Sequence, residues 1–200
     1  MKARLCLSLL LLLSLVQAGA CKGWLKGGDR KLVLTYKTDE NATPMTKELV
    51  AKQSVMIVSE FTTTANGQAA RIVEYRIYLA NYDLDARALE REMPRADGQM
   101  GVEIQIAGAE GSTSHTPFKT GTYNASQFSD GINKFNKALD IRVNFFENGR
   151  LQDLSISIAS PRKGFVKINS VDSDTVSGEV DMSDDFRAIK GEFSAVVVKP

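Results

Sequence analysis

The chain has 200 residues, of which 43% are hydrophobic and 24% are charged, and its 25 basic and 24 acidic side chains leave a formal net charge of +1. This much apolar material supports an ordinary folded domain and excludes a chain that is mainly disordered. The balanced charge argues against a nucleic-acid-binding protein, which needs a clustered excess of basic residues.

The first twenty residues have the pattern of an export signal. Lys2 and Arg4 form a short positive region, and an apolar stretch runs from Leu5 to Val16. A helix that spans a membrane needs roughly twenty apolar residues, so this stretch is too short to be one. Residues small enough for signal peptidase stand at its end, namely Ala18, Gly19 and Ala20. We therefore predict a signal peptide over residues 1–20.

Cys21 directly follows these small residues. A cysteine placed there resembles the lipobox of bacterial lipoproteins, although Ala18 stands where that family prefers leucine. The resemblance implies that diacylglycerol modifies the thiol of Cys21, that the chain is cut before it, and that the new amine is acylated. The alternative is ordinary signal cleavage, which would leave Cys21 as a lone free thiol because Cys6 departs with the signal.

The residues after Cys21 bear on where the protein goes. An aspartate directly after Cys21 would resemble the inner-membrane retention signal of bacterial lipoproteins. This chain has Lys22 at that position instead. By this likeness we expect a lipid anchor in the outer membrane and a domain that faces the periplasm or the cell surface. Glycines make residues 21–30 a flexible tether between the two. The membrane is then the predicted partner, and we expect neither nucleic acid nor a cofactor.

From residue 31 onward the apolar residues mostly recur with a period of two, which predicts strands. Two Asn-Gly pairs, at 66–67 and 148–149, predict hairpin turns because these residues accept the positive φ angles of a type I′ turn. The expected strands, in chain order, are 32–37, 55–64, 72–79, 102–106, 139–146, 151–158, 165–168, 176–180 and 189–193, with a last segment at 196–198.

Two of the expected strands contain a glycine. The segments VSGEV at 176–180 and IKGEF at 189–193 share the order apolar, polar, glycine, glutamate, apolar. A glycine inside a strand predicts a bend of the sheet or an aromatic ring that lies across the strand.

Helix is expected in only two short pieces. Asp85 caps a predicted helix over Ala86–Met93 that Pro94 ends, and Thr43 with Pro44 predicts a second one that runs through Lys52. We therefore predict a single all-β domain over residues 31–200, an antiparallel β-sandwich or a partly closed β-barrel with one or two short helices. Its last strands are similar to all-β domains of bacterial lipoproteins, a likeness that implies no activity.

The residues that catalysis commonly uses are sparse. His115 is the only histidine, and no nucleophile motif of the G-x-S-x-G type surrounds a serine. One histidine and one mature cysteine cannot supply the usual ligands of zinc, and no phosphate-binding glycine loop is present. We therefore predict a protein that does not act as an enzyme.

Carboxylates leave two further hypotheses open. Oxygen-rich turns near the end of the chain suit calcium, but tight turns use the same residues for their own hydrogen bonds. The weak calcium candidates are Asp172, Asp174, Asp181, Asp184 and Asp185. Paired carboxylates of a carbohydrate-active site could come from Glu60, Glu74, Glu103, Glu179 and Glu192, although a solvated strand face gives the same pattern.

The leading prediction is a lipid-anchored envelope protein that serves as a binding or structural module for a protein, glycan or lipid. A calycin-like carrier of lipid or another small apolar ligand is the first alternative, and a calcium-dependent or carbohydrate-binding module is the second. Tyr75, Tyr78 and Tyr82 either line a ligand groove or fill the core.

Overall fold

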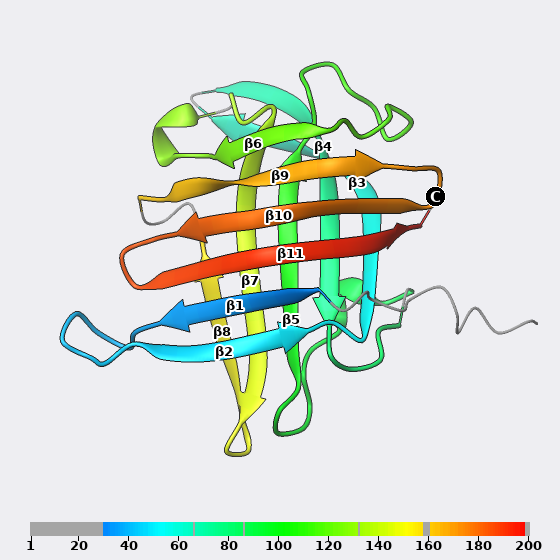
Figure 1. Ribbon diagram of the computed structural model, residues 1–200. Coiled ribbons are helices and arrows are strands. Elements are labelled where there is room, and N and C mark those ends of the chain that lie inside the picture. Colours follow the sequence, from blue (N-terminus) through cyan, green and yellow to red (C-terminus); the bar gives the residue numbers. More distant parts are fainter. Residues whose placement is uncertain (1–29, 66, 86, 132, 158–160, 199–200) are drawn as a thin grey trace, which may run out of the picture.

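The computed structural model describes residues 30–65, 67–85, 87–131, 133–157 and 161–198 (Figure 1). The predicted signal peptide, the predicted lipidation residue Cys21, its flank Ala18 to Ala20 and the predicted tether up to residue 29 lie outside the described residues.

The described chain is built almost entirely of strands, as the two-residue period predicts. They are β1 (Lys31–Tyr36), β2 (Met45–Val50), β3 (Gln53–Ala65), β4 (Gln68–Ala80), β5 (Met100–Ala107), β6 (Gly121–Ala125), β7 (Lys137–Glu147), β8 (Arg150–Ile156), β9 (Lys163–Val171), β10 (Thr175–Ser183) and β11 (Arg187–Val197). Two single 3-10 turns accompany them, at Leu89–Arg91 and Phe128–Asp130.

Eight of these strands close into a β-barrel in the order β10-β9-β6-β7-β5-β4-β3-β11, with β11 pairing back to β10. A front sheet of β6, β9, β10, β11, β1 and β2 lies crosswise over a back sheet of β3, β4, β5, β7 and β8 (Figure 1). Two short parallel pairings, β6 with β7 and β3 with β11, join the sheets at their corners. The prediction of an all-β sandwich or barrel is confirmed, and the barrel closes.

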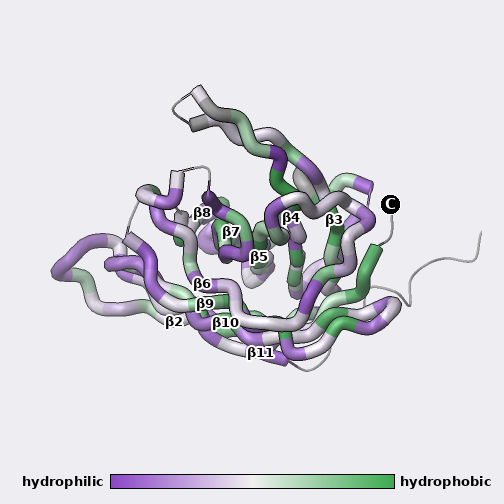
Figure 2. The backbone as a smooth tube through the Cα atoms, turned by 90° about the horizontal axis from the view of Figure 1, so that it is seen from above, coloured by the Kyte–Doolittle hydropathy of each residue, from purple (hydrophilic) through white to green (hydrophobic). Residues whose placement is uncertain are grey.

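Side chains from the facing surfaces of the two sheets fill the lumen. Ile77 and Ile104 of the back sheet and Ile189 and Phe193 of the front sheet belong to one continuous apolar cluster and are fully buried. Seen from above, the backbones of the two sheets face each other, while β3 and β4 extend away from the front sheet (Figure 2). Any ligand must therefore bind at an end of the barrel or on an outer face.

The predicted helix over Thr43–Lys52 is wrong, because this segment contains β2. All six residues of β2 pair with β1, and Leu49 is completely buried. A helix here would leave the edge of β1 without hydrogen-bond partners, which explains why tertiary pairing outweighs a local start signal. The predicted helix over Ala86–Met93 is reduced to the 3-10 turn Leu89–Arg91.

The glycines inside the last two strands are explained by close packing. A Cβ atom on Gly178 would lie 2.8 Å from Cζ of Phe193, the residue opposite it on β11. The aromatic ring thus crosses the strand at this glycine, as the sequence pattern predicts. Gly191 has a φ of 145°, and a Cβ there would lie 2.0 Å from the backbone oxygen of Lys31.

Candidate functional site

One end of the barrel is covered by the segment between β5 and β6. The ring of Phe118 stacks on that of Tyr75 with 4.1 Å between centroids, and the ring of Tyr123 packs against Phe118 at a tilt, with 5.5 Å between centroids. The hydroxyl of Tyr75 also donates a hydrogen bond of 3.0 Å to the carbonyl of Thr116. These contacts hold residues 116–118 over the end of the core.

Beside this cover lies an open apolar pocket of about 480 Å³, which we call the mouth pocket. Its walls come from β3 and β4, from the ends of β9 and β11, and from the covering segment. The apolar part of its lining consists of Met56, Val58, Tyr75, Pro117, Phe118, Val171, Val197 and Val198. A volume of this size is in the range of small-molecule sites.

His115 lies at the rim of the mouth pocket, on the covering segment, and is exposed. No local spacing associates His115 with Tyr75, which stands forty residues earlier in the chain. The barrel brings them together because the covering segment folds back over the strand that carries Tyr75.

A second concave surface lies on the outer face of the back sheet. This outer groove has a volume of about 360 Å³, with β5, β7 and β8 as its floor and residues from the segment between β4 and β5 as its wall. Its lining includes Tyr78, Tyr82, Leu84, Leu89, Glu92, Met93, Glu103, Asp140, Arg142, Asn144, Asp153 and Ser155.

Charged residues of this face are partly buried. Arg76 and Glu74 of β4 form an ion pair, and Nε of Arg76 lies 3.9 Å from Oε1 of Glu103 on β5. Burial raises the pKa of Glu74, although Arg76 acts in the opposite direction. The alternation of polar residues in β4, β5 and β7 thus marks a semi-enclosed face rather than one open to water.

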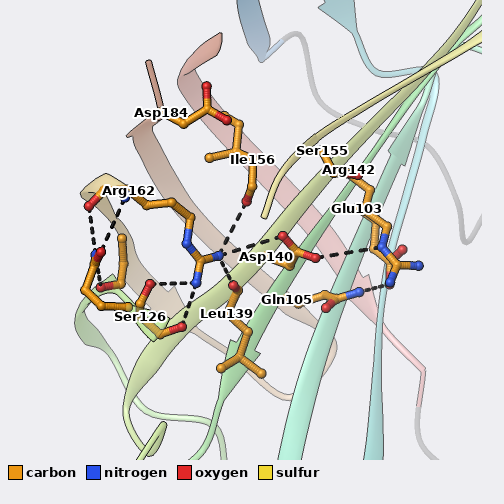
Figure 3. Close-up of polar contacts among 12 residues, drawn as sticks. Glu103, Gln105, Ser126, Leu139, Asp140, Arg142, Ser155, Ile156, Arg162 and Asp184 are labelled. Atoms are coloured by element: carbon orange, nitrogen blue, oxygen red, sulfur yellow. Dashed lines mark hydrogen bonds and ion pairs between the residues drawn. The ribbon is translucent and has the colours of Figure 1, made fainter. Parts of the chain in front are cut away.

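Asp140 connects the outer groove to a buried arginine. Its Oδ1 lies 3.7 Å from Nη1 of Arg162, and its Oδ2 lies 4.0 Å from Nε of Arg142 (Figure 3). Burial raises the pKa of Asp140 in spite of these two cations. Burial likewise raises the pKa of Tyr78 to about 12, and the nearby Glu103 carboxylate adds to this shift.

The guanidinium of Arg162 is completely buried and donates hydrogen bonds to backbone carbonyls. Its Nη2 donates hydrogen bonds to the carbonyl and the hydroxyl of Ser126, at 2.6 and 2.8 Å, and its Nη1 donates to the carbonyl of Leu139 (Figure 3). Sequence reasoning missed this residue, since an arginine after Ser-Pro in a predicted connection carries no signal of burial.

The five aspartates do not gather at one place. Asp172 and Asp174 border the turn between β9 and β10, whereas Asp184 and Asp185 lie in the turn at the other end of β10. Asp181 pairs with Lys190 at 2.9 Å. Asp184 accepts hydrogen bonds from the backbone N–H groups of Phe186 and of Arg187, the first residue of β11, as a turn aspartate does. Among the described residues, no group of three or more histidine, cysteine, aspartate or glutamate side chains could hold a metal ion.

The glutamate candidates divide between the two sheets. Glu74 and Glu103 lie on the same outer face of the back sheet, where both interact with Arg76. Glu179 and Glu192 are directly opposite each other in the front sheet, and Glu179 pairs with Lys167 at 3.0 Å. Glu60 lies apart from both pairs and accepts a hydrogen bond from the backbone of Ser114.

Comparison with known proteins gives no match, since no family model fits the chain and neither a curated protein nor a solved structure is significantly similar to it. Within the part of the chain that the structure describes, no helix has the length and apolarity needed to cross a membrane.

Proposed function

We propose that this protein is a lipid-anchored envelope protein that binds a small apolar ligand, such as an acyl chain, in the mouth pocket without transforming it. The observation that carries the proposal is the 480 Å³ apolar pocket at an end of an otherwise filled barrel. Valine, methionine and aromatic side chains line it, and transfer of a methylene group from water to such a surface is worth about 0.8 kcal/mol.

The position of Arg30, where the described chain begins, supports a role next to a membrane. Arg30, the first described residue, donates a hydrogen bond of 2.7 Å to the carbonyl of Phe193 on β11. The same strand ends at Val197, which lines the mouth pocket. A chain from Cys21 to Arg30 reaches at most about 30 Å, so an anchor at Cys21 keeps the pocket close to the lipid headgroups.

The ligand-binding part is tested with a dansylated undecanoic acid, whose fluorescence rises when it enters an apolar site. We expect saturable binding to the wild-type protein and its loss in Val171→Trp, which fills the pocket with a larger side chain. The matched control is Val50→Trp on β2, where the native side chain is 53% exposed. Equal affinity of both variants for the probe would refute the pocket as the binding site.

The anchor is tested separately by metabolic labelling with a palmitate analogue. We expect the wild-type protein to be labelled and to fractionate with membranes, and Cys21→Ala to lose both properties. An unlabelled wild-type protein, together with unchanged fractionation of Cys21→Ala, would refute the lipid anchor and leave the pocket proposal standing.

A further inference from the structure

A second pocket lies next to the mouth pocket, on the other side of the segment that covers the barrel end. It has a volume of about 220 Å³, and part of its lining comes from residues 108–112, directly after β5. Four residues line both pockets, namely Tyr75, Thr116, Pro117 and Phe118. These shared residues separate the two pockets, and we call them the dividing wall.

Tyr75 is the fixed part of the dividing wall. It lies on β4, its side chain is buried, and its hydroxyl donates a hydrogen bond of 3.0 Å to the carbonyl of Thr116. A Cβ atom on Gly108 would lie 3.2 Å from Cε2 of Tyr75, so the backbone at Gly108 packs closely against this ring. The strand, the hydrogen bond and this close packing leave the ring little room to move.

The ring of Phe118 closes the rest of the dividing wall. It stacks on Tyr75, whereas the ring of Tyr123, which packs against Phe118, lines the second pocket and not the mouth pocket. Phe118 lies on a connection between strands, and its side chain has no polar atom that could hold it by a hydrogen bond. An apolar chain in the mouth pocket therefore meets the ring of Phe118 before it can reach Tyr123.

The physics of burial gives the direction in which a fatty acid enters. A carboxylate is costly to remove from water without partners, whereas each methylene group that enters an apolar pocket is worth about fourfold in affinity. The tail therefore goes in first and the carboxylate stays at the rim. Affinity should rise with chain length until the tail reaches the dividing wall, and further carbons should gain nothing because they stay in water.

We propose that Phe118 sets the length of the acyl chain that the protein binds, because its ring ends the mouth pocket and keeps the tail out of the second pocket. This inference rests on the proposed function, since it assigns a limit to the same ligand. Phe118→Leu keeps an apolar side chain at this position and removes the ring, so that the two pockets join. A longer acyl chain then gains the 220 Å³ of the second pocket.

Displacement of the dansylated undecanoic acid by saturated fatty acids, from octanoic to hexadecanoic acid, tests the proposal. In the wild type we expect affinity to rise about fourfold per methylene and then to level off. Phe118→Leu should bind hexadecanoic acid at least about tenfold more tightly than the wild type does, and octanoic acid with less than about a threefold change. The matched control is Phe128→Leu, at a side chain that is 84% exposed, which should level off at the wild-type chain length.

Two further measurements assign the effect to the second pocket. Ala109 lines this pocket and not the mouth pocket, so adding Ala109→Phe to Phe118→Leu should restore the wild-type chain length. In the wild type, nuclear Overhauser contacts should join the terminal methyl of the longest acid that still gains affinity to the ring of Phe118 and not to that of Tyr123.

The outcomes separate this inference from the proposed function. Affinity that levels off at the same chain length in the wild type and in folded Phe118→Leu would overturn the role of Phe118, with folding checked by thermal unfolding. A contact between the terminal methyl and Tyr123 in the wild type would overturn it as well, and this measurement needs no variant. No displacement by any of the acids would refute the proposed function and the inference together.

Discussion

Arg162 donates a hydrogen bond to the carbonyl of Leu139 at the place where β7 changes its neighbour. On this edge β7 pairs with β6 at Lys137 and Ala138, and with β8 from Ile141 onward. Leu139 lies between these two stretches of β7, and its carbonyl accepts a hydrogen bond from the buried guanidinium. The guanidinium also donates to the carbonyl of Ser126, directly after β6. A single side chain therefore completes one of the two corners at which the sheets meet.

Replacing Arg162 by leucine should lower the free energy of unfolding by about 3 to 5 kcal/mol, because it orphans two buried carbonyls and the Asp140 carboxylate. Urea unfolding followed by circular dichroism measures this. The neighbouring Lys163→Leu, at an exposed position, should change stability by no more than about 0.5 kcal/mol. Similar stabilities of the two variants would contradict the role of Arg162.

Gly178→Ala should be destabilising by about 2 to 3 kcal/mol through steric overlap, since the added Cβ would lie 2.2 Å from the carbonyl oxygen of Lys167 and 2.8 Å from Phe193. The comparison variant is Gly111→Ala, which has a φ of 75° and nothing within 4 Å of the new Cβ. Gly111→Ala should therefore lose about 1 kcal/mol of stability, through the unfavourable φ angle alone. If thermal unfolding gives both variants the same loss, close packing at Gly178 is not the reason for that glycine.

The buried carboxyls of the back sheet should make stability depend on pH. Burial raises the pKa values of Asp140 and Glu74 from their ordinary 3.8 and 4.5. A carboxyl with a raised pKa binds more protons in the folded state, so its contribution to stability decreases as the pH rises from the ordinary value toward the raised one. Asp140→Asn cannot ionise. Its stability relative to the wild type should therefore increase with pH across this interval.

Urea unfolding of the wild type and Asp140→Asn from about pH 4 to about pH 7 measures this difference. Ser155→Ala, a change without charge on the same face, should follow the wild-type pH dependence. A stability difference between Asp140→Asn and the wild type that stays constant or declines with rising pH would contradict the raised pKa.

The cover of the barrel end should depend on one aromatic side chain. Phe118 is 7% exposed and stacks on Tyr75, so Phe118→Ala should cost about 3 kcal/mol of stability and loosen residues 116–118. Hydrogen exchange of that segment and urea unfolding measure the two effects. Phe128→Ala is the matched control, because Phe128 is 84% exposed and its loss should be nearly neutral. An equally small effect at Phe118 would show that the cover is held by other contacts.

The strands that sequence reasoning placed best are those with strong alternation and an unambiguous turn. Val143 and Phe145 face the core while Arg142 and Asn144 face the outer groove, as their alternation predicts. Asn148 and Gly149, with φ angles of 52° and 73°, form the expected turn between β7 and β8. Both features depend on residues close together in the sequence.

The candidate sites were far less predictable. The mouth pocket joins residues of β3, β4, β9 and β11 with the covering segment, and no local spacing connects them. A solvated strand face was one interpretation of Glu103 on β5, but the segment after β4 lies over this face and turns it into a groove. A polar alternation shows which residues share a face and does not show what covers that face.

The sequence by itself determined the all-β character of the domain, the positions of most strands and the two-sided pattern of each, because side-chain alternation and turn chemistry act over a few residues. Only the tertiary structure decided that β2 is a strand, that the barrel closes, that Arg162 and Tyr78 become buried and that Asp140 becomes half-buried. These features depend on pairing between segments that are distant in the chain, and the free energy of such pairing is absent from any short window of residues.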